Sequence, residues 1–170
     1  MANREQPLER QGGAALKLAE DGSQLVLYDG NRKGNPVWSS NGSRKETKVV
    51  ILDSGNLVMI DENHTTVWES FNYPGDTLFP RMNIGMGQKL SSWKSSVDPA
   101  PGSFTLELDP SGASQFVLLW NKFVCCWESG LWNGEIFSGL PKMATKYIYV
   151  FSVVKNHTGT IVYFTYSLKP

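Results

Sequence analysis

Short apolar runs alternate with polar, glycine-containing turns along the chain. The run at 24–28 is followed by Asp29-Gly30-Asn31, and the run at 56–60 is followed by a polar loop at 61–64. Short runs bounded by Gly, Asp and Asn are typical of β-strands joined by tight turns. No segment shows the 3.6-residue periodicity of an amphipathic helix. The pattern therefore predicts an all-β protein.

One passage of the sequence occurs twice. Gln24–Asp29 returns as Asn56–Asp61, and each copy leads through a polar turn to Val-Trp, ending at Trp38 and at Trp68. Self-similarity at about thirty residues indicates a repeated supersecondary unit. Because the two Trp residues occupy matching positions, we expect both in the core. Residues 1–3 read as the end of an earlier copy, so we expect a chain truncated at its start.

The Pro-rich stretch at 73–80 interrupts this pattern, and we interpret it as the exit from the repeat. Beyond it, the same kind of apolar run recurs. Further strands are predicted at 88–93, 104–108, 115–120, 123–127, 147–154 and 160–166. We therefore predict two domains, at 1–80 and 81–170.

Composition excludes several classes of partner. Sixteen basic residues balance sixteen acidic ones, so no global field favours nucleic acid or an anionic membrane. No apolar stretch reaches the roughly eighteen residues of a membrane span, and the N-terminus as given lacks the apolar core of a signal peptide. We expect no direct membrane insertion. N-glycosylation sequons at Asn41, Asn63 and Asn156 nevertheless indicate a secreted parent protein.

Residue types that carry chemistry are few and scattered. Cys125 and Cys126 are neighbours, which disfavours a disulfide between them; we expect two half-buried strand residues, with a bond to an outside partner as the alternative. His64 and His157 lie far apart in polar loops, which argues against a metal site or a catalytic triad. No pair of opposed carboxylates suggests a glycosidase. We predict no catalytic residue, no metal site and no cofactor.

Several longer blocks resemble a known family. They are Leu52–Val58, Trp68–Leu78, Leu90–Ser95, Ser129–Gly134, Phe137–Pro141 and Val162–Leu168. Together they are similar to plant bulb-type (G-type) lectins and to the S-locus glycoprotein-like ectodomains of S-domain receptor-like kinases. The resemblance implies a partial β-prism II lectin domain at 1–80, with its first sheet mostly absent. It also implies the N-terminal part of an S-locus glycoprotein domain at 81–170, so the chain would be truncated at both ends.

The resemblance further implies a non-catalytic recognition module, extracellular or attached to the plasma membrane in the parent protein. Its ligand would be a mannose-type glycan bound weakly, a protein or a peptide, and related proteins recognise pollen. A kinase belongs to many parents but is not expected here, because Gly85-Met86-Gly87 lacks the third glycine of a phosphate loop. The alternatives are a structural scaffold that forms homodimers and a truncated, unstable gene product.

The family's mannose site follows the pattern Gln-x-Asp-x-Asn-x-Val-x-Tyr, which places five side chains on one face of a strand. In the first copy the pattern falls on Glu20, Gly22, Gln24, Val26 and Tyr28. Gly22 removes the carboxylate, while Asp21 lies one position away and should point elsewhere. We predict a degenerate sugar site formed by Glu20, Gln24, Val26 and Tyr28.

In the second copy the same pattern falls on Leu52, Ser54, Asn56, Val58 and Ile60. Only the Asn and the Val agree with it. The loss of one charged hydrogen bond costs about 1.5–3 kcal/mol, or one to two powers of ten in affinity. We predict that the second site binds no sugar.

Overall fold

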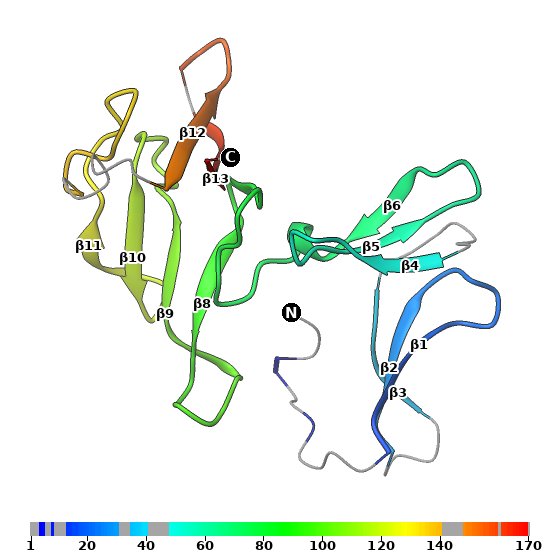
Figure 1. Cartoon of the computed structure of the whole chain (residues 1–170). Helices are drawn as coiled ribbons and strands as arrows, with labels where there is room; N and C mark the ends of the chain where they lie inside the picture. The colour runs from blue at the N-terminus through cyan, green and yellow to red at the C-terminus, as the bar shows by residue number, and fades with distance from the viewer. Residues whose placement is uncertain are drawn as a thin grey trace. The chain divides into compact units, whose positions relative to one another are not determined.

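The computed structural model describes residues 4–5, 8, 13–30, 35–40, 48–140, 148–159 and 161–169. In these ranges the chain forms antiparallel β-sheets and one 3-10 turn, Ser70–Asn72, which confirms the all-β prediction. Two compact units divide the chain: Met1–Tyr73 with Ser96–Ala100, and Pro74–Ser95 with Pro101–Pro170 (Figure 1). The predictions for residues 1–3 and for Asn41 fall outside the described residues.

The first unit contains the repeat as two three-stranded sheets. One sheet comprises β1 (Ala15–Leu18), β2 (Leu25–Tyr28) and β3 (Pro36–Ser39); the other comprises β4 (Lys48–Ile51), β5 (Leu57–Ile60) and β6 (Thr66–Glu69). In each sheet the middle strand pairs with both neighbours in antiparallel fashion. The pairing of the second strand with the third also shifts by one residue at the equivalent position in both copies. The shift lies between Leu27 and Tyr28 in the first copy and between Met59 and Ile60 in the second. The sequence repeat is therefore a structural repeat.

Glycine closes the first turn of each copy. Gly22 and Gly55 have φ angles of +72° and +83°, a region that residues with a Cβ rarely adopt. The turn between β1 and β2 is one residue longer than the turn between β4 and β5. The backbone hydrogen bond that spans it runs from the Ala19 N–H to the Gln24 carbonyl, whereas in the second copy the bond runs from the Leu52 N–H to the Asn56 carbonyl. Ser23 is the inserted residue.

The two sheets share one core. Leu25, Met59 and Trp68 are its buried members, and Trp38 packs against them. The rings of Trp38 and Trp68 meet edge to face with their centroids 6.2 Å apart. The Ser40 hydroxyl donates to the Met59 sulfur at 3.5 Å and accepts the Leu25 N–H at 2.9 Å. The prediction that both Trp residues lie in the core is confirmed.

The second unit contains a third copy of the three-stranded arrangement. It comprises β9 (Pro101–Leu108), β10 (Phe116–Trp120) and β11 (Val124–Glu128), and β8 (Lys89–Trp93) adds a fourth strand. Equivalent pairs in the three copies are Leu18 with Leu25, Ile51 with Leu57, and Leu108 with Phe116. The register again shifts after the residue that pairs with Trp, here between Leu118 and Leu119.

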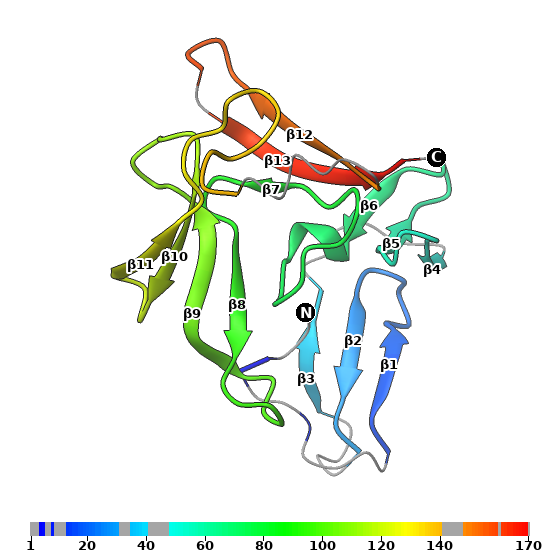
Figure 2. The same cartoon turned by 60° about the vertical axis from the view of Figure 1, so that its left-hand side comes forward.

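A second sheet of this unit has the order β12 (Tyr149–Lys155), β13 (Ile161–Leu168) and β7 (Ile84–Gly85). Figure 2 shows β13 between its two partners. An aromatic cluster joins this sheet to β10. The centroid of the Phe116 ring lies 5.3 Å from that of Phe164 and 5.4 Å from that of Phe137. The Trp132 ring packs against Phe137, with the two ring centroids 5.0 Å apart.

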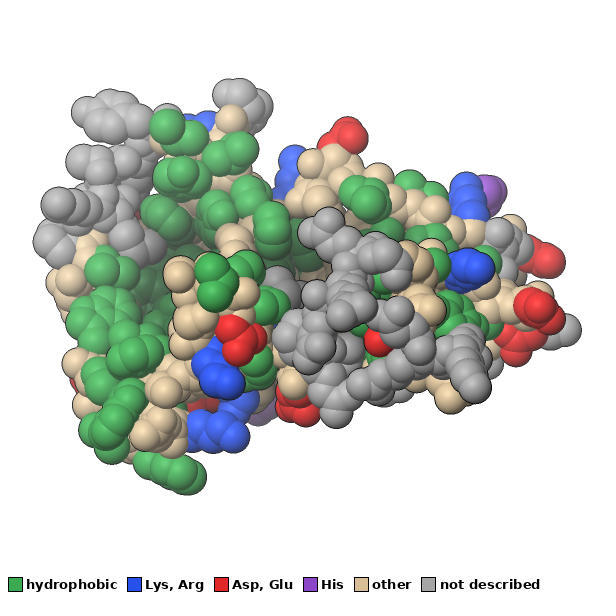
Figure 3. Space-filling view, turned by 90° about the horizontal axis from the view of Figure 1, so that it is seen from below, with side chains coloured by type: hydrophobic (Ala, Val, Ile, Leu, Met, Phe, Trp, Pro, Cys, Tyr) green, Lys and Arg blue, Asp and Glu red, His purple; other side chains and the backbone are tan. Residues whose placement is uncertain are grey.

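Part of the apolar face of the β8–β11 sheet is exposed. Phe104, Trp120, Val124 and Trp127 are 44%, 46%, 51% and 39% exposed. Figure 3 shows hydrophobic side chains gathered on the left of the molecule, where Figure 1 places β9 to β11.

The environment predicted for the two cysteines is wrong. We expected half-buried side chains, but Cys125 and Cys126 are free and exposed. Both lie on β11, which is an edge strand whose five residues are all exposed. An apolar run does not reveal whether a strand lies at the centre or the edge of its sheet.

Candidate functional site

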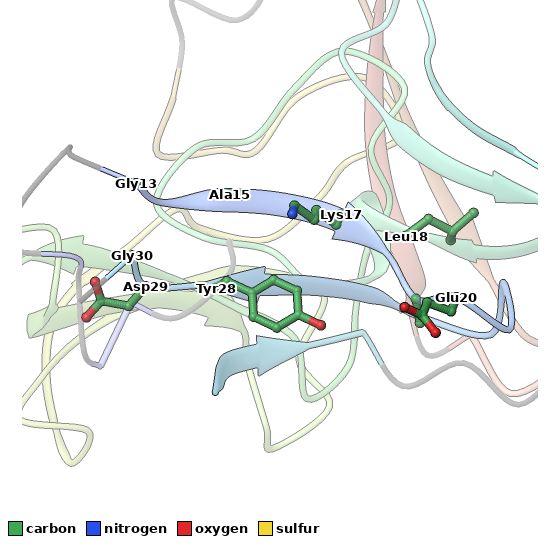
Figure 4. Close-up of a pocket in the computed structure, with 9 residues that line it drawn as sticks. Gly13, Ala15, Lys17, Leu18, Glu20, Tyr28, Asp29 and Gly30 are labelled. Carbon is green, nitrogen blue, oxygen red and sulfur yellow. The ribbon is translucent and has the colours of Figure 1, made fainter. Parts of the chain in front are cut away.

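A pocket of about 420 Å³ lies on the face of the β1–β2 hairpin that is turned away from the core (Figure 4). Its charged and polar lining comprises Lys17 from β1, Glu20 from the following turn, Tyr28 from the end of β2 and Asp29 directly after it. Cross-strand pairing brings these elements together, because Ala15 lies opposite Tyr28 and Lys17 opposite Val26. The alternate residues, such as Leu25, face the core.

Two of the four predicted sugar-binding residues line this pocket. Glu20 is exposed and Tyr28 is half-buried. Figure 4 shows the Tyr28 hydroxyl directed along the hairpin towards the end that carries Glu20. Val26 shares the face of Tyr28 but is buried at 7% exposure, and Gln24 is half-buried; neither lines the pocket.

Asp21 does not line the pocket, as expected. Its Oδ1 atom accepts the Ser23 N–H at 3.0 Å and the Ser23 hydroxyl at 2.6 Å. The inserted Ser23 thus holds this carboxylate within the turn. The pocket instead receives its carboxylates from Glu20 and Asp29 and an ammonium group from Lys17.

Sequence reasoning missed Lys17 and Asp29. Lys17 could have been predicted from the sequence, because side chains alternate along a strand and Lys17 therefore lies on the opposite face from Leu16 and Leu18. Asp29 follows β2 directly, so the family pattern ends one residue before it.

In the second copy the side chain that matches the pattern is used internally. The Asn56 amide nitrogen donates to Glu69 at 2.7 Å, and its oxygen accepts from the Ser70 hydroxyl at 3.0 Å and the Phe71 N–H at 3.1 Å. Asn56 is only 6% exposed. Its hydrogen-bonding groups therefore stabilise the β5–β6 connection.

The other candidate residues lie in turns. Asn63 and Asn156, the two described sequon residues, are exposed, as are the adjacent His64 and His157. In the described ranges, no three His, Cys, Asp or Glu residues gather closely enough to hold a metal ion. No helix in those ranges is long and apolar enough to cross a membrane.

The predicted face thus carries a polar pocket on a repeated three-stranded unit. Residues 1–97 match the family model of the D-mannose binding lectins. The chain belongs to the D-mannose binding lectin family. This confirms the resemblance inferred from the sequence blocks.

Curated relatives from Arabidopsis thaliana extend this result beyond the lectin region. The G-type lectin S-receptor-like serine/threonine-protein kinase B120 is 41% identical to this lectin over 98% of the chain. The corresponding kinase SD2-2 is 34% identical over 94% of the chain, and the receptor-like serine/threonine-protein kinase SD1-7 is 35% identical over 99%.

The chain spans about a fifth of these relatives' length, 21% for B120 and 20% for SD2-2 and SD1-7. It is a fragment of this family and matches the lectin ectodomain of the kinases, not their kinase domain.

Proposed function

We propose that this lectin is an extracellular recognition module of the plant receptor-like kinase type. It binds a hydroxyl-rich ligand in the pocket on the β1–β2 hairpin. The observation that carries the proposal is that Glu20 and Tyr28, which the family pattern selects, line one pocket with Lys17 and Asp29. Carboxylates and a phenol hydroxyl can accept and donate the hydrogen bonds that sugar hydroxyls require.

Mannose-type glycans bind weakly to this module. The carboxylate that the family pattern requires is absent at Gly22, and Asp21 is held by Ser23 instead. We expect the affinity for mannose to be about ten- to a hundredfold below that of a site with the full pattern. The second copy binds no sugar, because Asn56 is occupied by Glu69, Ser70 and Phe71.

Saturation-transfer difference NMR with methyl α-mannoside tests this proposal, since the method detects weak binding. Glu20→Gln and Tyr28→Phe should each reduce the signal several-fold. The matched control is Asp53→Asn, because Asp53 follows Leu52 as Glu20 follows Ala19 in the equivalent turn. A signal that is unchanged in both test variants, or reduced equally in the control, would contradict the proposed site.

We also propose the two domains, the glycosylated residues and the location of the parent protein. Residues 1–80 form a truncated bulb-type lectin domain, and residues 81–170 form the N-terminal part of an S-locus glycoprotein domain. Asn63 and Asn156 carry N-glycans in the parent protein, which their exposure in turns supports. The parent lies outside the cell or at the plasma membrane. A role in pollen recognition stays a prediction from the resemblance.

Self-association is the second candidate function. The observation that favours it is the exposed edge strand β11, which carries Val124 and Trp127 and lies beside Trp120 of β10. An edge strand with unpaired backbone groups can pair with the same strand of a second copy.

Sedimentation velocity at increasing protein concentration tests self-association. Val124→Lys should keep the protein monomeric if β11 is the interface. Ile51→Lys is the matched control, because Ile51 is an exposed aliphatic residue on the edge strand β4. A wild-type protein that is monomeric at every concentration would exclude this candidate.

A further inference from the structure

A second, smaller pocket lies on the β12–β13–β7 sheet. Its volume is about 190 Å³, and its lining includes Arg81, Asn83, Ser152, Thr165 and Ser167. At about 30 Å³ per water molecule, this volume corresponds to roughly six waters. The pocket therefore suits one small polar group or a single sugar ring rather than an extended ligand.

The hydroxyl groups of this lining share one face of the sheet. Ser152 lies directly opposite Thr165 in the register of β12 and β13, and Ser167 follows two residues later on the same strand. Phe164 alternates with these residues and is buried in the aromatic cluster on the other face. The polar face is thus opposite the core of this unit.

Arg81 is held beside β13 in an unusual backbone conformation. Its φ angle is +67°, and its N–H donates to the Tyr166 carbonyl at 2.6 Å. The side chain is exposed and makes no ion pair or hydrogen bond within the part of the chain that the structure describes. The guanidinium group is therefore available to an anion at the pocket.

Thr165 supplies a second, independent observation. Its Oγ1 atom is buried and has no hydrogen-bond partner among the described residues. Buried hydroxyl groups in folded proteins nearly always have a partner. That atom is shielded from solvent, so a ligand oxygen in this pocket would reach it after the Thr165 side chain rotates about χ1.

We propose that this pocket binds a small hydroxylated carboxylate, of which a uronic acid is the simplest example. Arg81 binds the carboxylate, because its planar guanidinium group matches two carboxylate oxygens. Asn83, Ser152 and Ser167 bind the ligand hydroxyls. Arg81 is the one cationic side chain of the lining, which suits a monoanion better than a phosphate dianion. The site is separate from the pocket on the β1–β2 hairpin and does not depend on sugar binding there.

Amide proton–nitrogen NMR of the full chain tests the proposal. Galacturonate at low ionic strength should shift the amide signals of Ser152, Thr165 and Ser167, whereas neutral galactose should leave them unchanged. Equal shifts with galactose would overturn the role of the carboxylate. Tighter binding of inorganic phosphate than of galacturonate would also overturn the assignment, as would the absence of any shift.

Arg81→Gly is the sharpest variant. Glycine adopts a φ of +67° without strain, so the variant should fold with a thermal midpoint at or above that of the wild type. It should bind galacturonate about ten- to a hundredfold more weakly. Arg81→Lys should retain part of the affinity. Lys89→Ala, which changes the net charge equally at an exposed position on β8, should bind as the wild type does.

Wild-type affinity in Arg81→Gly would overturn the proposal. If that variant does not fold, Ser152→Ala takes its place, since Ser152 is an exposed strand residue whose hydroxyl can be removed with little effect on folding. Weaker binding by Ser152→Ala supports the proposal, and unchanged binding contradicts it.

Discussion

At the scale of single residues, a serine after the third strand anchors each copy of the three-stranded unit. The hydroxyl oxygens of Ser40, Ser70 and Ser129 accept the first N–H of the middle strand at 2.9, 3.0 and 2.8 Å. Ser40 and Ser129 are almost fully buried, at 1% and 0% exposure. The same bond therefore recurs in all three copies, although the surrounding sequences differ.

Ser129→Ala should lower the free energy of unfolding by about 1–3 kcal/mol, because the Phe116 N–H would lose its acceptor in a buried position. Urea denaturation followed by Trp fluorescence measures this change. Ser103→Ala, at an exposed position on β9, is the control and should change stability by less than about 0.5 kcal/mol. Equal effects of the two substitutions would refute the anchoring role.

A carboxylate at the β9–β10 turn makes stability depend on pH. Hydrogen bonds from Gln115 and Ser111 hold the pKa of the Asp109 carboxyl below its ordinary value of 3.8. The Gln115 amide donates to Asp109 Oδ2 at 2.8 Å and the Ser111 N–H to Oδ1 at 2.9 Å. Because the folded state favours the ionised form, its contribution is present above pH 3.8 and is lost as the pH falls through the lowered pKa.

Asp109→Asn should therefore lose stability at pH 6 and show a smaller further loss between pH 6 and pH 3 than the wild type does. The urea midpoint at the two pH values measures this difference. Asp53→Asn, at an exposed turn position, should leave the pH dependence unchanged. A wild-type pH dependence in Asp109→Asn would show that other groups cause the acid sensitivity.

At the scale of elements, the sequence predicts the strands well and the third copy poorly. The first two copies stand out because Gln24–Asp29 and Asn56–Asp61 are similar and equally placed before Trp. The third copy carries the matching signal Trp127-Glu128-Ser129, which repeats Trp68-Glu69-Ser70. The segment at 70–100, which contains β7 and β8, separates the third copy from the second, and the turn between β9 and β10 is longer, so the regular spacing by which a repeat is recognised is lost.

The sequence also does not reveal in which copy the apolar face of the sheet is covered by a neighbouring sheet. Trp38, Trp68 and Trp127 pair with Leu27, Met59 and Leu118 at the same register position. Trp68 is nevertheless 8% exposed and Trp127 is 39% exposed. Burial here depends on the neighbouring sheet, which strand periodicity cannot specify.

These matched positions give a direct comparison. Trp68→Ala should destabilise the first unit by about 3–5 kcal/mol, because it leaves a cavity beside Met59 and Trp38. Trp127→Ala should cost about 1–2 kcal/mol, since much of the ring already contacts water. Urea unfolding monitored by amide NMR separates the two units. A larger loss from Trp127→Ala would mean that a partner surface covers β11.

At the scale of the whole molecule, the chain has a lectin fold whose polar pocket differs from the family pattern. The sequence placed Glu20 and Tyr28 in the candidate site, and both line the pocket. Gln24 and Val26 are also predicted to belong to the site but do not line the pocket, since Val26 is buried at 7% exposure and Gln24 is half-buried. Ser23 lengthens the turn before β2 and holds Asp21, and cross-strand pairing brings Lys17 in from the neighbouring strand.

We expect this chain to fold by itself as a recognition module with its sugar-binding face on the β1–β2 hairpin. The most direct measurement is an amide proton–nitrogen NMR spectrum of residues 1–170, recorded without and with excess methyl α-mannoside. We predict dispersed signals and small shifts confined to residues 15–20 and 24–30, with none at 52–60. A collapsed spectrum would contradict the fold of the isolated chain, and shifts centred on Asn56 would contradict the assignment of the site.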